Sequence, residues 1–366
     1  MTNYRLINLC ANNDRQIIPE RTKRIGVDTE FIRERTYYAK LCLLQVSTNS
    51  EIICIDPLGS SQTDVLLPNQ FWQEITQFEW VLHAARQDLE IVYETSNLLP
   101  HDVFDTQIAA ALLGFPAQVG YAKLVSDLFN VELDKAYTRA DWSKRPLSKP
   151  LLKYAAEDVH YLLPAYEQLV ARLKSAGRLD WAIEDSRNLL DVSLYKSDPS
   201  TAIERLKGAR TMQGKPWAAA ARLASWRERE AIRTNRPRQW VLSDRLLLKM
   251  AALLPNSMKT LASVDGLPEK TVQWAGKDLL QIIEHAETDQ LRYEGPRRPD
   301  EKGKAILKEM QQKVKVTAQN LKLAPELIAP KKELSAAVIG NRKSRVFCGW
   351  RQEIIGNQLL ELLEGS

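Results

Sequence analysis

The N-terminal part of the chain alternates between short apolar runs and polar turns. Runs rich in Val, Ile, Leu and Cys cover residues 24–30, 39–48 and 51–56, and the Thr-Asn-Ser-Glu stretch joining the last two predicts a hairpin turn. A fourth apolar run, at 80–84, follows a stretch with helical spacing. Short apolar runs bounded by turn residues are typical of buried strands. The pattern therefore predicts a β-sheet that begins with antiparallel hairpins.

The spacing of apolar residues becomes helical after the fourth strand. Helices are expected from Asp88 and after Phe104, where Asp105 or Thr106 can cap the helix start. Because antiparallel hairpins are followed by strand–helix alternation, we expect a mixed α/β sheet with helices packed on it.

A longer helix is expected from Ser148, which supplies a hydroxyl cap ahead of a proline in the first turn. Pro164 should bend or interrupt this helix, because proline lacks the backbone N–H that a helix interior needs. Gly177 can end the continuation, since glycine adopts the left-handed conformation common after helix C-termini.

Beyond about residue 201 the pattern is helical throughout, divided by polar stretches. The stretches at 185–201 and 293–303 are expected to be linkers. The leucine-rich residues 276–284 recur in weak form at 356–364, which indicates a duplicated small helical domain. We therefore predict three domains, at 1–190, 201–292 and 303–366.

Composition narrows the class of protein without identifying it. The 366 residues are 44% hydrophobic and 27% charged, enough for globular cores, and the net charge of +5 is compatible with a polyanionic partner. The sequence shows neither a run of ~18 apolar residues nor a signal peptide, so we expect a soluble cytoplasmic protein with no membrane partner. The four cysteines lack metal-site spacing and are expected to be free thiols: Cys10, Cys42, Cys54 and Cys348.

Two carboxylates lie at the end of the first strand. Asp28 and Glu30 are spaced i, i+2, so both side chains point to the same face of the strand. Two adjacent acids repel each other unless a positive charge lies between them. A solvated strand end is the alternative interpretation of this pair alone.

Three further residues carry candidate chemistry. Tyr154 and Asp158 are spaced i, i+4 and share one helix face, whereas Glu157 points about 100° away, toward solvent. Asp88 lies where a strand gives way to a helix, a usual place for functional groups in an α/β sheet. Each residue alone also fits a structural role, as a surface ion pair, a core aromatic or a helix cap.

Together these residues describe a site for metal ions. Carboxylates from a strand, a strand end and a helix can converge on two hard divalent cations, which prefer oxygen ligands. Two such ions ~3.5–4 Å apart stabilise the attacking and leaving oxygens of an in-line phosphodiester cleavage.

Three segments, in order, resemble the exonuclease motifs of the DEDD superfamily. Asp28-Thr-Glu30-Phe matches the first motif, His83-Ala-Ala-Arg-Gln-Asp88 the second, and Tyr154-Ala-Ala-Glu-Asp158 the third in its tyrosine form. The Asp-Trp-Ser-Lys-Arg-Pro-Leu segment ahead of the third motif is typical of the same branch. With these motifs, the chain resembles the bacterial ribonuclease D family over nearly its whole length.

The helical part resembles the helicase-and-RNase-D C-terminal (HRDC) domain. Its markers are Trp226-Arg-x-Arg-x-Ala231, Asn235-x-Pro-Arg238 and Asp244-x-x-Leu. The last block resembles, more loosely, a degenerate second copy through Ala324-Pro-Glu-Leu-Ile and Gly349-Trp-Arg-Gln-Glu-Ile-Ile-Gly356.

The resemblance implies an α/β ribonuclease H-like exonuclease domain, a mixed sheet with flanking helices, followed by two small all-α HRDC-type domains. It implies a 3′-to-5′ exoribonuclease that releases nucleoside 5′-monophosphates by two-metal-ion hydrolysis. The expected partners are single-stranded RNA 3′ ends, in particular those of tRNA precursors, and we expect a monomer.

The resemblance also assigns roles to the acidic residues and the tyrosine. Asp28, Glu30, Asp88 and Asp158 are expected to hold two Mg²⁺ or Mn²⁺ ions. Tyr154 is expected to orient the attacking water as a protonated hydroxyl, because the ordinary pKa of tyrosine is ~10.

Contacts to the nucleic acid are expected from residues around the site and from the helical part. Each has a structural alternative: core packing for Phe31, a solvated surface for Lys135, and pinning of their own loop for Trp142, which we expect to be exposed, and Arg145. The basic cluster at 227–238 is equally typical of a solvated helix face, although the resemblance favours phosphate contact by its members, Arg227, Arg229, Arg233, Arg236 and Arg238. Asp105 could be taken for a fifth metal ligand, but a helix cap fits its position better.

Two rival functions share the same residues. A DNA 3′-to-5′ exonuclease would use the same carboxylates. A catalytically silent RNA-binding module would keep only the fold, and the intact set of four acids and a tyrosine argues against it.

Overall fold

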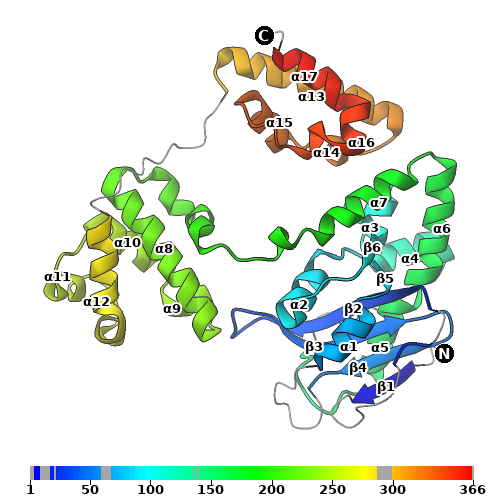
Figure 1. Ribbon diagram of the computed structural model, residues 1–366, viewed down its shortest axis with the longest axis horizontal. Coiled ribbons are helices and arrows are strands. Elements are labelled where there is room, and N and C mark those ends of the chain that lie inside the picture. Colours follow the sequence, from blue (N-terminus) through cyan, green and yellow to red (C-terminus); the bar gives the residue numbers. More distant parts are fainter. Residues whose placement is uncertain are drawn as a thin grey trace. The chain divides into compact units, whose positions relative to one another are not determined.

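The computed structural model of the chain divides into two compact units by its internal contacts (Figure 1). The first comprises the described parts of residues 1–32, 40–195 and 298–366, and the second those of 33–39 and 196–297. The residues that the structure describes are 4–8, 17–19, 22–58, 67–134, 136–137, 140–286 and 299–364.

A six-stranded mixed sheet forms the centre of the first unit, with strand order β1-β4-β3-β2-β5-β6. Strands β2, β3 and β4 pair antiparallel, while β1 is parallel to β4, and β5 and β6 extend the other edge in parallel. The predicted mixed sheet is therefore confirmed, and β1 is an addition to it. The strands are β1 (Tyr4–Asn8), β2 (Arg24–Ile32), β3 (Lys40–Ser47), β4 (Ile52–Asp56), β5 (Glu79–Leu82) and β6 (Asp102–Asp105).

One face of β2 is closely covered by helices. Gly26 lies opposite Ser47, and a Cβ atom at Gly26 would lie only 2.3 Å from Ser47 Oγ and 3.0 Å from Leu162 Cβ. Glycine is therefore required for the helix to approach the strand here. Because side chains alternate along a strand, Asp28 and Glu30 lie on the same face as Gly26.

Two helices that follow each other in the chain lie on this face. Helix α5 (Lys149–His160) begins at Ser148, whose hydroxyl accepts the backbone N–H of Leu151, and α6 (Leu162–Ser175) follows after one residue. The predicted interruption is confirmed, because Pro164 lies in the first turn of α6. Gly177 follows α6 with a φ of +65°. The other helices around the sheet are α1 (Asn69–Ile75), α2 (Arg86–Ser96), α3 (Thr106–Ala111), α4 (Tyr121–Phe129) and α7 (Leu179–Arg187), with short 3₁₀ turns at Asn188–Leu190 and Val192–Leu194.

The C-terminal helices pack against α7 of the same unit. The indoles of Trp181 and Trp350 stack with centroids 4.4 Å apart, and buried Arg351 donates two hydrogen bonds to Asp185, at 2.6 and 2.7 Å. That this block is a second HRDC-type domain stays a prediction, as do the three domain boundaries. Its elements are α13 (Glu301–Leu321), α14 (Pro325–Ile328), α15 (Lys331–Val338), a 3₁₀ turn (Arg345–Phe347), α16 (Gly349–Arg351), a π-helical turn (Gln352–Gly356) and α17 (Asn357–Glu364).

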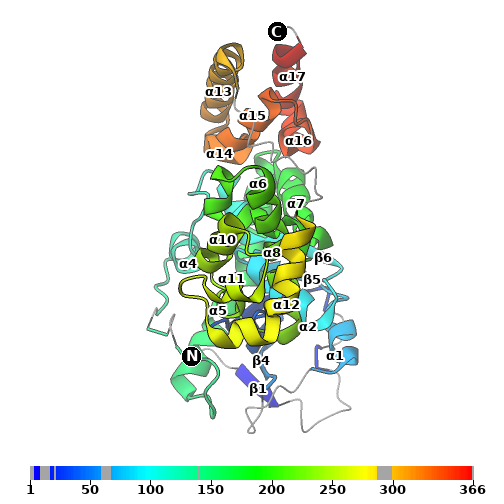
Figure 2. The same ribbon diagram turned by 90° about the vertical axis from the view of Figure 1, so that its left-hand side faces the viewer.

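The described part of the second unit is helical apart from the segment 33–39 and short connecting turns. Helices α8 and α12 lie side by side (Figure 2). They pack around a core that includes Leu223, Met250 and Leu279. Within the part of the chain that the structure describes, no helix has the length and apolar character needed to cross a bilayer. The elements of this unit are 3₁₀ helices at Pro199–Arg205 and Lys207–Thr211, then α8 (Gly214–Thr234), α9 (Arg238–Val241), α10 (Asp244–Leu253), α11 (Met258–Ala262) and α12 (Glu269–His285).

Candidate active site

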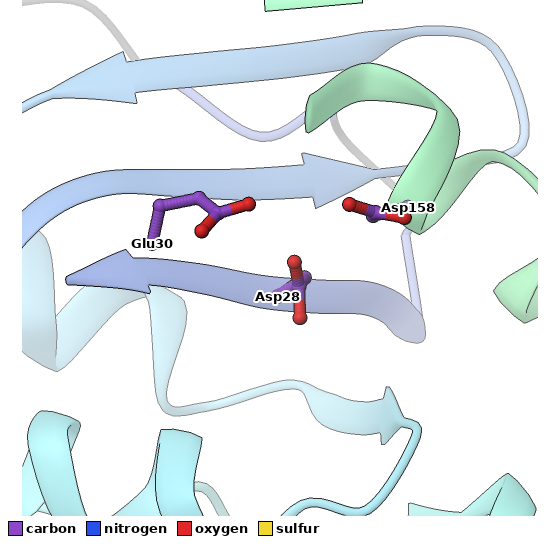
Figure 3. A group of neighbouring side chains, drawn as sticks. All are labelled: Asp28, Glu30 and Asp158. Atoms are coloured by element: carbon purple, nitrogen blue, oxygen red, sulfur yellow. The ribbon is translucent and has the colours of Figure 1, made fainter. Parts of the chain in front are cut away.

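Three carboxylates from one strand and one helix converge on the covered face of the sheet. Asp28 and Glu30 project from β2 and Asp158 projects from α5, and a ligand oxygen of each lies within 4.8 Å of those of the other two (Figure 3). The expected meeting of these acids is therefore what the structure shows.

Helix α5 is fixed above the sheet by a hydrogen bond next to Asp158. The hydroxyl of Ser47 on β3 donates to the carbonyl oxygen of Val159 at 2.8 Å. The hydroxyl of Tyr154, one turn before Asp158, donates to the Asp158 carboxylate and lowers its pKa, though less than burial raises it. Tyr154 thus lies at the edge of the acidic group, as its spacing from Asp158 predicts.

Asp88 approaches the group from the first turn of α2. The hydroxyl of Thr29 donates to Asp88 Oδ1 at 2.5 Å, so β2 itself holds this carboxylate. Asp88 is not part of the tight group of three, but its charge is close enough to raise the pKa of both Asp28 and Glu30.

Burial raises the pKa of all four acids and so disfavours their ionisation, and the charges of neighbouring site acids add to this effect at Asp28 and Glu30. Burial, followed by the charges of Asp158 and Asp88, raises the pKa of Glu30 to about 9, and burial raises the pKa of Asp88 and of Asp158 to about 7. The pKa of Asp28 is also raised well above its usual value, by burial and then by the three neighbouring charges. A cation bound between the acids would reverse this preference. The oxygen-only donor set fits a hard divalent cation.

Comparisons with known proteins show the family of the chain. Residues 14–174 match the 3′-5′ exonuclease family and residues 218–283 match the HRDC domain family. The chain is 36% identical to ribonuclease D of Gluconacetobacter diazotrophicus over 95% of its own length and 90% of that protein, and 34% identical to ribonuclease D of Xanthomonas oryzae pv. oryzae over 94% of each. The chain belongs to the ribonuclease D family.

Solved structures extend the similarity to the fold. The crystal structure of Escherichia coli RNase D superposes with a TM-score of 0.83 at 28% identity, covering 94% of each chain. The catalytic core of RRP6 from Trypanosoma brucei has a TM-score of 0.56 at 26% identity and covers 74% of this chain. As a ribonuclease D, the protein is a 3′-to-5′ exoribonuclease, and it has an HRDC domain after its exonuclease domain.

One supporting residue of this ribonuclease D has a larger role than its sequence predicted. The expected cap is confirmed, because Asp105 accepts the N–H of Gln107 at 2.8 Å at the start of α3. Its carboxylate also accepts the N–H groups of Ala84 and Ala85, at 3.1 and 2.8 Å. Ala84 has a φ of +59°, which is unfavourable for alanine, and this turn leads directly into α2 with Asp88. The only sequence signal was an acid at the end of a strand.

The loop ahead of α5 is pinned to the sheet. Arg145 donates to both carboxylate oxygens of buried Asp56, at 2.6 and 2.8 Å, and to the carbonyl oxygen of Cys42. Trp142 is only 3% exposed and packs against Tyr154, with ring centroids 6.3 Å apart. The expectation of an exposed tryptophan was wrong, because the loop folds its indole inward, and these contacts match the loop-pinning alternative.

The other residues expected around the site have less decisive positions. Phe31 is half-buried on β2, next to an irregularity in the register between Glu30 and Phe31. Lys135 lies outside the described residues. Glu157 lies 3.5 Å from Lys153 in an ion pair, and its side chain is 19% exposed, less than expected of a residue that points to solvent. It is not a member of the acidic group, although its charge raises the pKa of Asp158.

Two arginines expected to contact RNA have partners inside the second unit. Arg227 is 4% exposed and donates to Asp244 at 2.6 Å and to the carbonyl oxygen of Leu242. Arg238 donates to buried Glu228 at 2.5 and 2.7 Å. RNA contact by Arg227 and Arg238 stays a prediction. Arg229, Arg233 and Arg236 of the same cluster are exposed.

Proposed function

We propose that this ribonuclease D trims single-stranded RNA from its 3′ end and releases nucleoside 5′-monophosphates with the help of two Mg²⁺ or Mn²⁺ ions. The observation that carries the proposal is the convergence of Asp28, Glu30 and Asp158 within 4.8 Å. The site has one buried acid, Asp88, and three partly buried ones, and they are unstable in the ionised form unless cations compensate them. This supports a metal site and argues against a solvated strand end.

The four carboxylates would share the ligation of the ions. Asp28, Glu30 and Asp158 form the tight group, and Asp88, held by Thr29, supplies a fourth carboxylate beside it. When bound, such ions lower the pKa of a coordinated water and stabilise the charge that develops on the reacting phosphate.

Tyr154 is proposed to orient the attacking water, which places the enzyme in the tyrosine subtype of the superfamily. Its hydroxyl donates to Asp158 and is therefore held at the edge of the acidic group. The rings of Tyr137 and Trp142 pack against the Tyr154 ring, with centroids 6.0 and 6.3 Å away, and limit its rotation.

A digestion of end-labelled RNA tests the proposal. With 5′-labelled single-stranded RNA and Mg²⁺ or Mn²⁺, the product should be a ladder that shortens with time, while 3′-labelled RNA should release labelled mononucleotide at once. EDTA and the variants Asp28→Ala and Asp158→Ala should remove cleavage while leaving RNA binding largely intact. Cleavage by Asp28→Ala at a near wild-type rate would contradict the metal-site assignment.

The proposal extends to the substrate and the helical domains. We propose a cytoplasmic monomer that acts on tRNA precursors, and the solved relative from Escherichia coli is described as acting in structured RNA processing. The exposed arginines Arg229, Arg233 and Arg236 are proposed to contact phosphates of the RNA, and the C-terminal block to be a degenerate second HRDC domain. A tRNA with a 3′ trailer should lose the trailer and retain its folded body, which gel analysis of the product would show.

A further inference from the structure

Gln45, on the central strand β3, is fully buried yet unpaired. Its exposed fraction is 0%, and neither side-chain atom, Oε1 or Nε2, has a hydrogen-bond partner among the described residues. Neighbouring buried polar groups are satisfied, since Thr29 donates to Asp88 and Ser47 donates to Val159. Buried amides are almost always hydrogen-bonded, so an orphaned one requires an explanation.

The register places Gln45 beside the acidic group. Gln45 lies directly opposite Asp28 of β2, and on its other side it lies opposite Cys54 of β4. Residues directly opposite each other in an antiparallel pair point to the same face, with Cβ atoms ~4.5–5.5 Å apart. The Gln45 side chain therefore lies on the face of Asp28 and Glu30, under α5, which packs on β2, β3 and β4.

The two neighbours differ in how well they can bind the amide. An ionised carboxylate only accepts hydrogen bonds, and it can accept from the NH₂ group of a glutamine. A buried thiol such as Cys54 is only a weak donor and a weak acceptor. The Asp28 carboxylate is therefore the stronger partner, and the amide can bind it only through its NH₂ group.

We propose that Gln45 is a positioning residue of the metal site, whose side-chain NH₂ group donates to the Asp28 carboxylate, directly or through one water molecule, when the site holds its cations. This inference rests on the proposed metal site. Carboxylates that bind metal ions are usually held by such hydrogen bonds, and their loss typically lowers metal affinity or activity 10–100-fold. The orphaned amide of the metal-free protein is then the preformed half of this bond.

Gln45→Met tests the proposal through two measurements with opposite expected signs. Methionine has nearly the shape of glutamine and no amide. In EDTA, the thermal midpoint of Gln45→Met should equal or exceed that of the wild type, because a buried amide without partners is replaced by an apolar group. The affinity for Mn²⁺, measured by calorimetry or electron paramagnetic resonance without RNA, should fall 10–100-fold. Gln45→Leu provides a second apolar variant if the methionine variant does not fold.

Thr76→Val is the matched control. Thr76 is also buried, but it lies at the C-terminal end of α1, outside the acidic group, and its hydroxyl donates to the carbonyl oxygen of Trp72. Its replacement should lower the thermal midpoint and leave Mn²⁺ affinity unchanged. Unchanged Mn²⁺ affinity in Gln45→Met would overturn the proposal, and so would a parallel loss of midpoint and affinity, which indicates packing alone. Asp28→Ala separates the two hypotheses: wild-type Mn²⁺ binding by that variant would refute the metal site itself.

Discussion

At the residue scale, the acids of the site are unfavourably placed until they have a counter-charge. Burial raises the pKa of Asp158 from 3.8 to about 7 and that of Glu30 to about 9. The folded, metal-free protein therefore binds protons that the unfolded chain has already released. Its free energy of unfolding should fall as these protons leave with rising pH.

This linkage predicts a pH-dependent gain in stability from Asp158→Asn. Because the folded pKa of Asp158 is raised, the wild type loses stability from about pH 4 to about pH 7, and the asparagine variant avoids its share of this loss. The difference between the two, measured by thermal unfolding in EDTA, should grow over that range and then level off at up to about 4 kcal/mol, because each unit of pKa shift corresponds to about 1.4 kcal/mol. Glu309→Gln, which replaces an exposed carboxylate of α13, is the control, and a difference that does not vary with pH would refute the linkage.

Tyr154→Phe should separate catalysis from metal binding. The variant keeps the ring that packs against Trp142 and loses the hydroxyl held by Asp158. At saturating Mn²⁺, where any weaker ion binding caused by the lost bond to Asp158 does not contribute, we expect kcat to fall about 100-fold, the usual penalty for a misplaced reactant. Tyr137→Phe, which alters the neighbouring ring, is the control in the same end-label assay. Full activity of Tyr154→Phe would show that Tyr154 contributes only to packing.

The sequence was sufficient to predict the acidic residues of the site, but not the residues that hold them in place. Periodicity places Asp28 and Glu30 on one strand face and Tyr154 and Asp158 on one helix face, because each pair lies within one element. The resemblance to a known family then joins the two pairs in one site. The bond from Thr29 to Asp88 spans 59 residues, and the orphaned state of Gln45 depends on the strand register. Local patterns contain neither kind of information.

At the element scale, a single carboxylate holds two helix starts together. Asp105 caps α3 and accepts the backbone N–H groups of the strained turn that begins α2. The position of Asp88 therefore depends on a residue of the neighbouring strand β6. This coupling of strand ends explains how Asp88, outside the tight group of three carboxylates, is held beside it.

Asp105→Ala should therefore weaken both stability and metal binding. Loss of a cap costs about 0.5–2 kcal/mol, and unsatisfied buried N–H groups add about 1–3 kcal/mol. Urea unfolding should show a loss of at least about 2 kcal/mol, with reduced Mn²⁺ affinity because α2 is displaced. Asp300→Ala removes the cap of α13 and should cost about 1 kcal/mol without changing Mn²⁺ affinity. Equal effects of the two variants on Mn²⁺ binding would contradict the role of Asp105 in positioning α2.

The missed strand β1 shows the limit of pattern analysis at this scale. Tyr4–Asn8 is a five-residue edge strand, and Leu6 is 42% exposed, so its sequence lacks the continuous apolar run of β3 or β4. It exists because its backbone pairs with β4. By contrast, the breaks at Pro164 and Gly177 were predictable because backbone chemistry alone dictates them.

At the scale of the whole molecule, sequence patterns predicted three consecutive domains, whereas contacts group the C-terminal helices with the exonuclease sheet. Trp350 and Arg351 bind α7 through Trp181 and Asp185, about 166 residues earlier. The sequence contained the helices of this block, but nothing in their periodicity indicates which surface they cover.

Arg351→Met should destabilise the first unit, because the Asp185 carboxylate would lose its counter-charge. Removing one partner of a buried ion pair typically costs 3–5 kcal/mol, since Asp185 would remain buried without its counter-charge. The double variant Asp185→Leu/Arg351→Met should recover most of this loss in urea unfolding. Additive losses in the double variant would show that the pair acts only through packing.

RNA affinity should depend on the exposed arginines of the second unit. The triple variant Arg229→Gln/Arg233→Gln/Arg236→Gln should bind single-stranded RNA more weakly. The slope of log K against the logarithm of the salt concentration should become less steep by about 2, because each lost phosphate contact contributes about 0.7. Lys304→Gln/Lys308→Gln/Lys315→Gln makes the same change in net charge on α13 and should leave the slope unchanged. Identical slopes for the two triple variants would assign the effect to net charge alone.

Because the C-terminal helices pack against α7, this contact can form only late in the synthesis of the chain. Arg351 is polymerised 166 residues after Asp185, a delay of roughly 10–30 s at common rates of elongation. Until then, Asp185 and Trp181 of α7 lack their C-terminal partners. The four acids of the site have by that time already been synthesised. A chain that stops early would therefore carry the residues of a nuclease together with an exposed surface that chaperones and proteases recognise.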